Sequence, residues 1–107
     1  MARVARLSTH VLDTVHGRPA AGVAVELRDP DAVIARAVTD ADGRAVVLDG
    51  GLRAGPYELR FAIGDLFDQD PPFLDVVPVR FTVIDPDAHH HVPLLCSPWS
   101  YTTYRGS

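Results

Sequence analysis

The sequence predicts an all-β protein, an antiparallel β-sandwich of seven to eight short strands. Apolar and polar residues alternate with a period of two in several segments, which is the pattern of a half-buried strand. Glycine, proline and aspartate recur between these segments at short spacing, and the apolar spacing typical of helices is almost absent. Because no repeat or linker interrupts this pattern, we expect residues 1–107 to form a single domain.

Eight segments are expected to form the strands. The first places its odd-numbered side chains on one face and His10 on the other, and the cleanest alternation is that of "YELRFAI". The last segment contains no Lys, Asp or Glu, so its edge is little protected and we expect it to pair with another copy, giving a dimer. In chain order, the expected strands are residues 6–14, 23–29, 33–40, 45–49, 57–63, 75–85, 89–98 and 99–105.

The residues that connect these segments predict turns, a possible helix and an edge strand. "DADGR" at 40–44 contains the Asp-Gly pair typical of a β-hairpin. The segment 64–70 has room for one short helix before Pro71 and Pro72 stop it. Pro78 lies inside an expected strand, and because proline cannot donate to a strand ladder, it predicts an edge strand or a bulge.

Composition excludes several classes of function. The formal net charge is -4 and the ten basic residues are scattered, which argues against a nucleic-acid partner. No apolar run reaches the roughly 18 residues that a membrane span needs, so we expect no membrane association. Cys96 is the only cysteine and cannot form an internal disulfide, and the first eight residues lack the apolar core of a signal peptide. We therefore expect a cytoplasmic protein.

Histidines are the residues best suited to chemistry. His89 and His91 lie two apart on an expected strand, face the same way and could converge on a metal ion together with His10. The alternatives are polar residues entering a strand and, for His10, a surface side chain or one satisfied by a backbone carbonyl. Arg44 follows the Asp-Gly turn, where arginines are normally solvated. Taken separately, these residues indicate only a small β-sandwich protein.

The chain terminus combines a ring hydroxyl, a guanidinium, a glycine and a serine in "YRGS". Gly106 and Ser107 alone would be compatible with a cloning remnant. The alternative is a binding site, because Tyr104 and Arg105 directly before them add a ring hydroxyl and a guanidinium.

Read together, "LSTHVLDT", "TDADGR", "GPYELRF", "HVPLL" and the terminal "YRGS" resemble the 5-hydroxyisourate hydrolase family, the transthyretin-like enzymes of urate breakdown. The resemblance runs from about residue 7 to the end of the chain. It implies a transthyretin-like sandwich assembled as a homotetramer, a dimer of dimers, with active sites in the cleft between dimers. It also implies hydrolysis of 5-hydroxyisourate to 2-oxo-4-hydroxy-4-carboxy-5-ureidoimidazoline with no cofactor and no metal.

The resemblance also implies which residues act. One histidine would activate water while the other orients the substrate or protonates the leaving nitrogen, and Arg44 would bind the substrate and stabilise an oxyanion. Ser107 would orient water or a histidine through its hydroxyl or carboxylate. The implied catalytic residues are His10, His91, Arg44 and Ser107, and the implied substrate-binding residues are His10, Arg44, Tyr104, Arg105 and Gly106.

The sequence departs from the family pattern in two places. His90 stands where the family often has tyrosine, and we expect its side chain to face away from the site. The segment near 64–75 is about two residues shorter than usual, which bears on the small helix but not on the site. Two rival hypotheses stay open: a non-catalytic transthyretin-like protein that binds a small molecule, and a metal site on the histidines.

Overall fold

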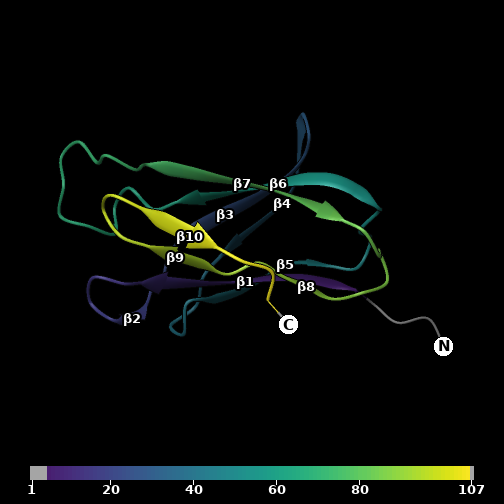
Figure 1. The fold of residues 1–107 in the computed structure, drawn as a ribbon, viewed down its shortest axis with the longest axis horizontal. Coiled ribbons are helices and arrows are strands. Elements are labelled where there is room, and N and C mark those ends of the chain that lie inside the picture. Colours follow the sequence, from purple (N-terminus) through teal and green to yellow (C-terminus); the bar gives the residue numbers. More distant parts are fainter. Residues whose placement is uncertain (1–4, 107) are drawn as a thin grey trace.

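The computed structural model describes residues 5–106, and these residues form two sheets stacked face to face (Figure 1). Most strands match the segments expected from sequence, and the expectation of an all-β sandwich is confirmed. A two-residue strand in the loop after the first strand, and a break within 89–98, bring the strands of this part of the chain to ten. They are β1 (Arg6–Asp13), β2 (Arg18–Pro19), β3 (Ala24–Asp29), β4 (Ala32–Val38), β5 (Arg44–Asp49), β6 (Gly55–Ala62), β7 (Val76–Val83), β8 (His90–His91), β9 (Leu94–Cys96) and β10 (Tyr101–Thr103).

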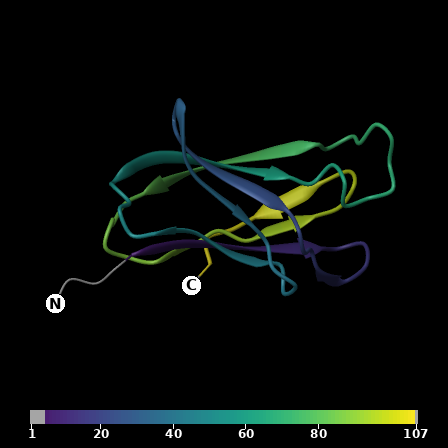
Figure 2. The same ribbon diagram turned by 180° about the vertical axis from the view of Figure 1, so that it is seen from behind.

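One sheet has the order β4-β3-β6-β7 and is antiparallel throughout. The other has β1 at its centre, paired with β2, β5, β8 and β9, and β10 lies at the edge beyond β9. Figure 2 shows the same two layers from behind, with the chain crossing from β4 in one layer to β5 in the other. The pairs β1–β8 and β1–β9 are parallel, so this sheet is mixed where the sequence led us to expect antiparallel pairing.

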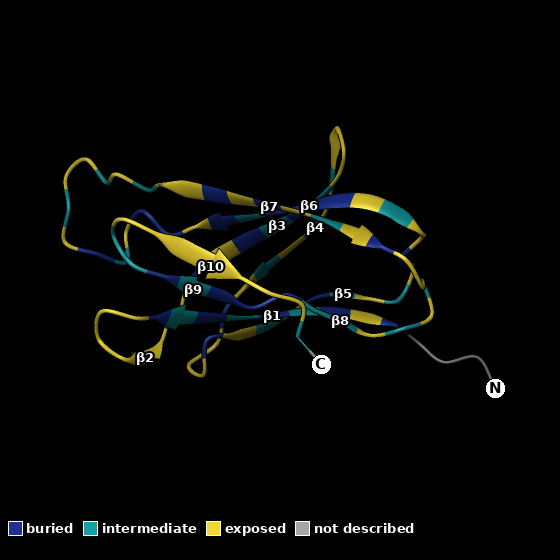
Figure 3. Cartoon of the chain, in the orientation of Figure 1, coloured by how far each residue is buried: buried dark blue, intermediate teal, exposed yellow. Residues whose placement is uncertain are grey.

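The core lies between the sheets and is built from the alternation read in the sequence. On β1 the odd-numbered side chains are buried, whereas Ser8, His10 and Leu12 are half-buried on the outer face and Arg6 is exposed. Phe61 and Leu59 on β6 are fully buried opposite them. Figure 3 shows these buried stretches along the inner strands, whereas β10 is exposed along its length. Pro78 lies on β7, which is an edge strand, as its missing N–H predicts.

The short helix expected near 64–70 does not form in this part of the chain. The Leu66 N–H donates to the Ile63 carbonyl at 3.0 Å and the Gln69 N–H donates to the Phe67 carbonyl at 2.8 Å, which closes two separate turns and no helix. The connection then has to reach β7, and Pro71 and Pro72 supply no N–H that would extend a helix. Phe67 is buried in the core, and Leu66 and Leu74 pack against it, so apolar contacts hold this loop.

The Asp-Gly turn at 40–44 forms, but the β-hairpin expected there does not. The Gly43 N–H donates to the Asp40 carbonyl at 2.9 Å, yet β4 continues into one sheet and β5 into the other. Gly43 has φ 73°, and a Cβ there would lie 2.5 Å from the Val11 carbonyl oxygen. The turn is therefore anchored against β1, and the expected pairing of its flanking strands is lost.

Candidate active site

The outer face of β1 collects three of the residues proposed from the sequence. Because side chains alternate along a strand, Ser8 and His10 share this face. Antiparallel pairing with β5 places Arg44 directly opposite His10. Parallel pairing with β8 places His91 directly opposite Ser8. Residues far apart in the sequence are thus brought to one surface by the pairing of a single central strand.

His91 is held by contacts on its ring and on its backbone. Its Nδ1 lies 2.8 Å from Ser8 Oγ, in a half-buried contact. Its carbonyl oxygen accepts from the Gly106 N–H at 2.8 Å, and the next residue, Val92, donates its N–H to the Ser8 carbonyl at 2.9 Å. The imidazole therefore has a fixed orientation, with Nδ1 turned toward β1 and Nε2 left for another partner.

His10 is oriented by the Asp-Gly turn. Its Nε2 lies 2.9 Å from the Asp42 carbonyl oxygen. A carbonyl only accepts hydrogen bonds, so Nε2 carries the proton in this contact, and in the neutral ring Nδ1 is then an acceptor. The Asp40 carboxylate accepts the N–H groups of Asp42 and Arg44 at 2.9 and 3.0 Å, which fixes the turn that presents both partners.

Electrostatics favour a neutral His91. Burial lowers the pKa of His91 below its ordinary value of 6.5, and the nearby charges of Arg44 and His10 lower it further. A neutral imidazole at neutral pH can accept a proton from water. The arrangement thus provides a proton acceptor beside a permanent cation.

These residues line an open hollow of about 390 Å³. Ser8, Asp40, Arg44, Val46 and His91 contribute to its walls, and His10 lies beside it. The hollow is large enough for a small polar heterocycle. The Arg44 guanidinium at its wall can donate hydrogen bonds to ring oxygens and can stabilise negative charge.

The C-terminal residues fall into two groups. Gly106 packs against the His91 ring, because a Cβ at this position would lie 2.5 Å from His91 Cδ2. Tyr104 and Arg105 instead line a second cavity, of about 240 Å³, between β7 and the C-terminal segment. His91 lines both cavities, but within one chain Tyr104 and Arg105 do not line the hollow that contains Arg44. Ser107, expected to be catalytic, lies outside the described residues.

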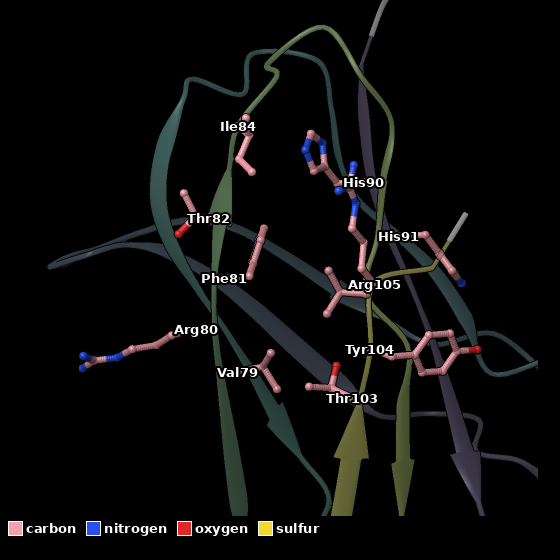
Figure 4. Close-up of a pocket in the computed structure, with 11 residues that line it drawn as sticks. Val79, Arg80, Phe81, Thr82, Ile84, His90, His91, Thr103, Tyr104 and Arg105 are labelled. Carbon is pink, nitrogen blue, oxygen red and sulfur yellow. The ribbon is translucent and has the colours of Figure 1, made fainter.

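His90 faces away from the hollow, as expected. It lines the second cavity, and Figure 4 shows its ring on the opposite side of their shared strand from His91. His89 is also turned elsewhere, because its Nδ1 accepts the Arg6 N–H at 3.1 Å. Residues 5–106 contain no group of three or more potential metal ligands. No helix in the same range is long and apolar enough to cross a membrane.

Sequence reasoning missed two contributors to this site. Ser8 was not singled out as a functional residue, although its place on the same strand face as His10 was the available signal. The Asp42 carbonyl is a backbone group, so no side-chain motif could have marked it.

Comparison with known proteins agrees with this architecture. The chain belongs to the HIUase/Transthyretin family, whose family model matches residues 7–106. It is 51% identical over 113 residues to 5-hydroxyisourate hydrolase of Deinococcus radiodurans, covering 94% of this chain and 95% of the relative. Its fold is similar to that of Klebsiella pneumoniae 5-hydroxyisourate hydrolase, with TM-score 0.85, 35% identity and coverage of 96% and 99%. Sea bream transthyretin in complex with thyroxine is similar with TM-score 0.80, 32% identity and coverage of 94% and 93%.

Proposed function

We propose that this protein hydrolyses 5-hydroxyisourate to 2-oxo-4-hydroxy-4-carboxy-5-ureidoimidazoline. The observation that carries the proposal is the convergence of His10, Arg44 and His91 on one face of the β1 sheet. Relatives that cover nearly the whole chain and are named 5-hydroxyisourate hydrolase support it. This is hydrolysis of a C–N bond in a cyclic substrate.

In the proposed mechanism, His91 Nε2 accepts a proton from water as the water oxygen bonds to the ring carbonyl carbon. Arg44 stabilises the negative charge that develops on the carbonyl oxygen. When the intermediate collapses, the C–N bond breaks and the imidazolium returns its proton to the leaving nitrogen. His10 orients the substrate, because its Nδ1 can accept a hydrogen bond from a ring N–H.

We propose that Tyr104, Arg105 and Ser107 act in a homotetramer, a dimer of dimers, with a site in each cleft between dimers. Two surfaces support assembly. The edge strand β10 is exposed along its length, and β7 forms an edge of the other sheet. Phe73 and Trp99 form an exposed aromatic pair with ring centroids 5.8 Å apart. We further propose a cytoplasmic location, which suits a protein whose only cysteine is buried and free.

The test is a coupled ultraviolet assay in which urate oxidase generates 5-hydroxyisourate and its decay is followed with and without this protein. Faster decay that is lost in His91→Asn, with the fold intact by circular dichroism, supports the hydrolase. The rate should not change with a chelator, since the proposed steps use no metal. Unchanged decay in the presence of folded protein would favour a transthyretin-like binding protein instead.

A further inference from the structure

Ser8 makes the side-chain hydrogen bond to the ring of His91, and the proposed chemistry has not yet used it. The two residues are register partners in the parallel pair β1–β8, so their side chains leave the sheet on the same face. Their backbones are tied as well, because the Val92 N–H donates to the Ser8 carbonyl at 2.9 Å. On the opposite face, Thr9 Oγ1 donates to the Val92 carbonyl at 2.7 Å. The contact of 2.8 Å between Ser8 Oγ and His91 Nδ1 thus lies on a rigid support.

The direction of that hydrogen bond decides what His91 can do. If the Ser8 hydroxyl donates to Nδ1, the proton of the neutral ring is on Nε2, and Nε2 cannot accept a proton from water. If Nδ1–H donates to Ser8 Oγ, the lone pair is on Nε2 and faces away from β1. Only the second arrangement makes His91 a general base at the atom that remains open.

We propose that Ser8 is a positioning residue that accepts the Nδ1–H of His91 and so holds the imidazole in the tautomer whose Nε2 takes a proton from water. This inference rests on the proposed hydrolase function. Ser8 acts through His91 and needs no contact with the substrate.

The other charged and titratable groups near His91 are donors or have partners of their own, so Ser8 is the acceptor available to the His91 Nδ1–H. On β5 the nearby charged group is Arg44, which can only donate hydrogen bonds. On β1 the nearby titratable group is His10, whose Nε2 is bonded to the Asp42 carbonyl. In the turn before β5, the Asp40 carboxylate accepts backbone N–H groups. From the C-terminal segment, the Gly106 N–H donates to the His91 carbonyl oxygen, and Tyr104 and Arg105 line the second cavity, which His91 also lines.

The experiment compares Ser8→Thr with Ser8→Val, because these two side chains have nearly the same shape and differ by the hydroxyl. Both residues suit a strand, so the pair isolates the hydrogen bond from packing. The ¹⁵N chemical shifts of His91 identify the protonated ring nitrogen without any reference to activity. Steady-state kinetics on 5-hydroxyisourate, followed against pH, give kcat and KM for each variant.

We expect the wild type and Ser8→Thr to show a protonated Nδ1 and an unprotonated Nε2 on His91. We expect kcat of Ser8→Val to be about tenfold below that of Ser8→Thr, because the variant loses one hydrogen bond that orients the base. KM should change little. A bond donated by Nδ1–H is stronger in the imidazolium, so its loss should lower the pKa of His91 and move the acid limb of the rate to lower pH.

Three outcomes would overturn the inference. These are an unprotonated Nδ1 in the wild type, an acid limb that moves to higher pH in Ser8→Val, and equal kcat in two folded variants. Failure of the proposed function gives a different result, since wild-type protein would then not accelerate substrate decay. The ¹⁵N shifts would still report the Ser8–His91 tautomer in that case.

Discussion

Gly106→Ala tests whether the terminus positions the proposed base. A Cβ at Gly106 would lie 2.5 Å from His91 Cδ2 and 3.1 Å from the His91 carbonyl oxygen. The ring or the terminus must therefore move by about 0.9 Å to reach the 3.4 Å at which ordinary van der Waals contact begins. A displacement of about 1 Å in a catalytic group costs about a hundredfold in rate. That loss corresponds to about 2.7 kcal/mol of activation free energy.

The coupled assay measures this effect directly, and thermal unfolding separates it from a loss of stability. Gly106 is not among the glycines with positive φ, so alanine introduces no backbone strain there and the melting temperature should hold. Gly17→Ala is the matched control, because Gly17 has φ 65° with nothing within 4 Å of a new Cβ. That variant should lose about 1–2 kcal/mol of stability and keep its turnover. Full activity in Gly106→Ala would refute the idea that this contact sets the position of His91.

Three further predictions concern the hollow and the core. His10→Asn should lower kcat/KM by about a hundredfold with an unchanged melting temperature, because it removes the imidazole that orients the substrate. For the wild type, the hydrolysis rate should fall as pH drops through the lowered pKa of His91, because the base becomes protonated. Arg44→Gln removes a nearby positive charge, so it should raise that pKa and move the decrease in rate to higher pH. It should also lower the maximal rate, and a pH–rate profile measures both effects. Phe61→Ala should cost about 3–5 kcal/mol of unfolding free energy in a urea titration, since the side chain is 0% exposed; a cost below 1 kcal/mol would contradict the core described above.

Much of the fold could be predicted because its signals are local. The alternation of apolar and polar residues on β1 requires one buried face. A shift of one residue in strand pairing would bury His10 and expose Val11, so the sequence alone predicts which face of β1 is buried. The edge position of β7 follows from Pro78 in the same way. The Asp-Gly turn is equally local, but the sheet that each flanking strand joins is decided by distant packing. That is why the turn was found and the hairpin was not.

The site could be predicted only in part. The resemblance singled out His10, Arg44 and His91, and strand pairing brings these three together, while their catalytic roles stay a prediction. The contact between Ser8 and His91 depends on parallel pairing of β1 with β8, and no local pattern encodes that register. The placement of Arg44 and Arg105 in different cavities, both lined by His91, likewise depends on how the C-terminal segment crosses the sheet.

The central position of β1 has a consequence for the order of folding. The Ser8–His91 and Thr9–Val92 hydrogen bonds join residues 83 positions apart, so the central sheet closes only after long-range contacts have formed. Topologies dominated by such distant pairings fold on a timescale of roughly milliseconds to seconds. Hairpins such as β6–β7 can form earlier, but no single hairpin brings His10, Arg44 and His91 together. Catalytic recovery after dilution from denaturant should therefore follow the slowest structural phase, which makes turnover a reporter of the completed fold.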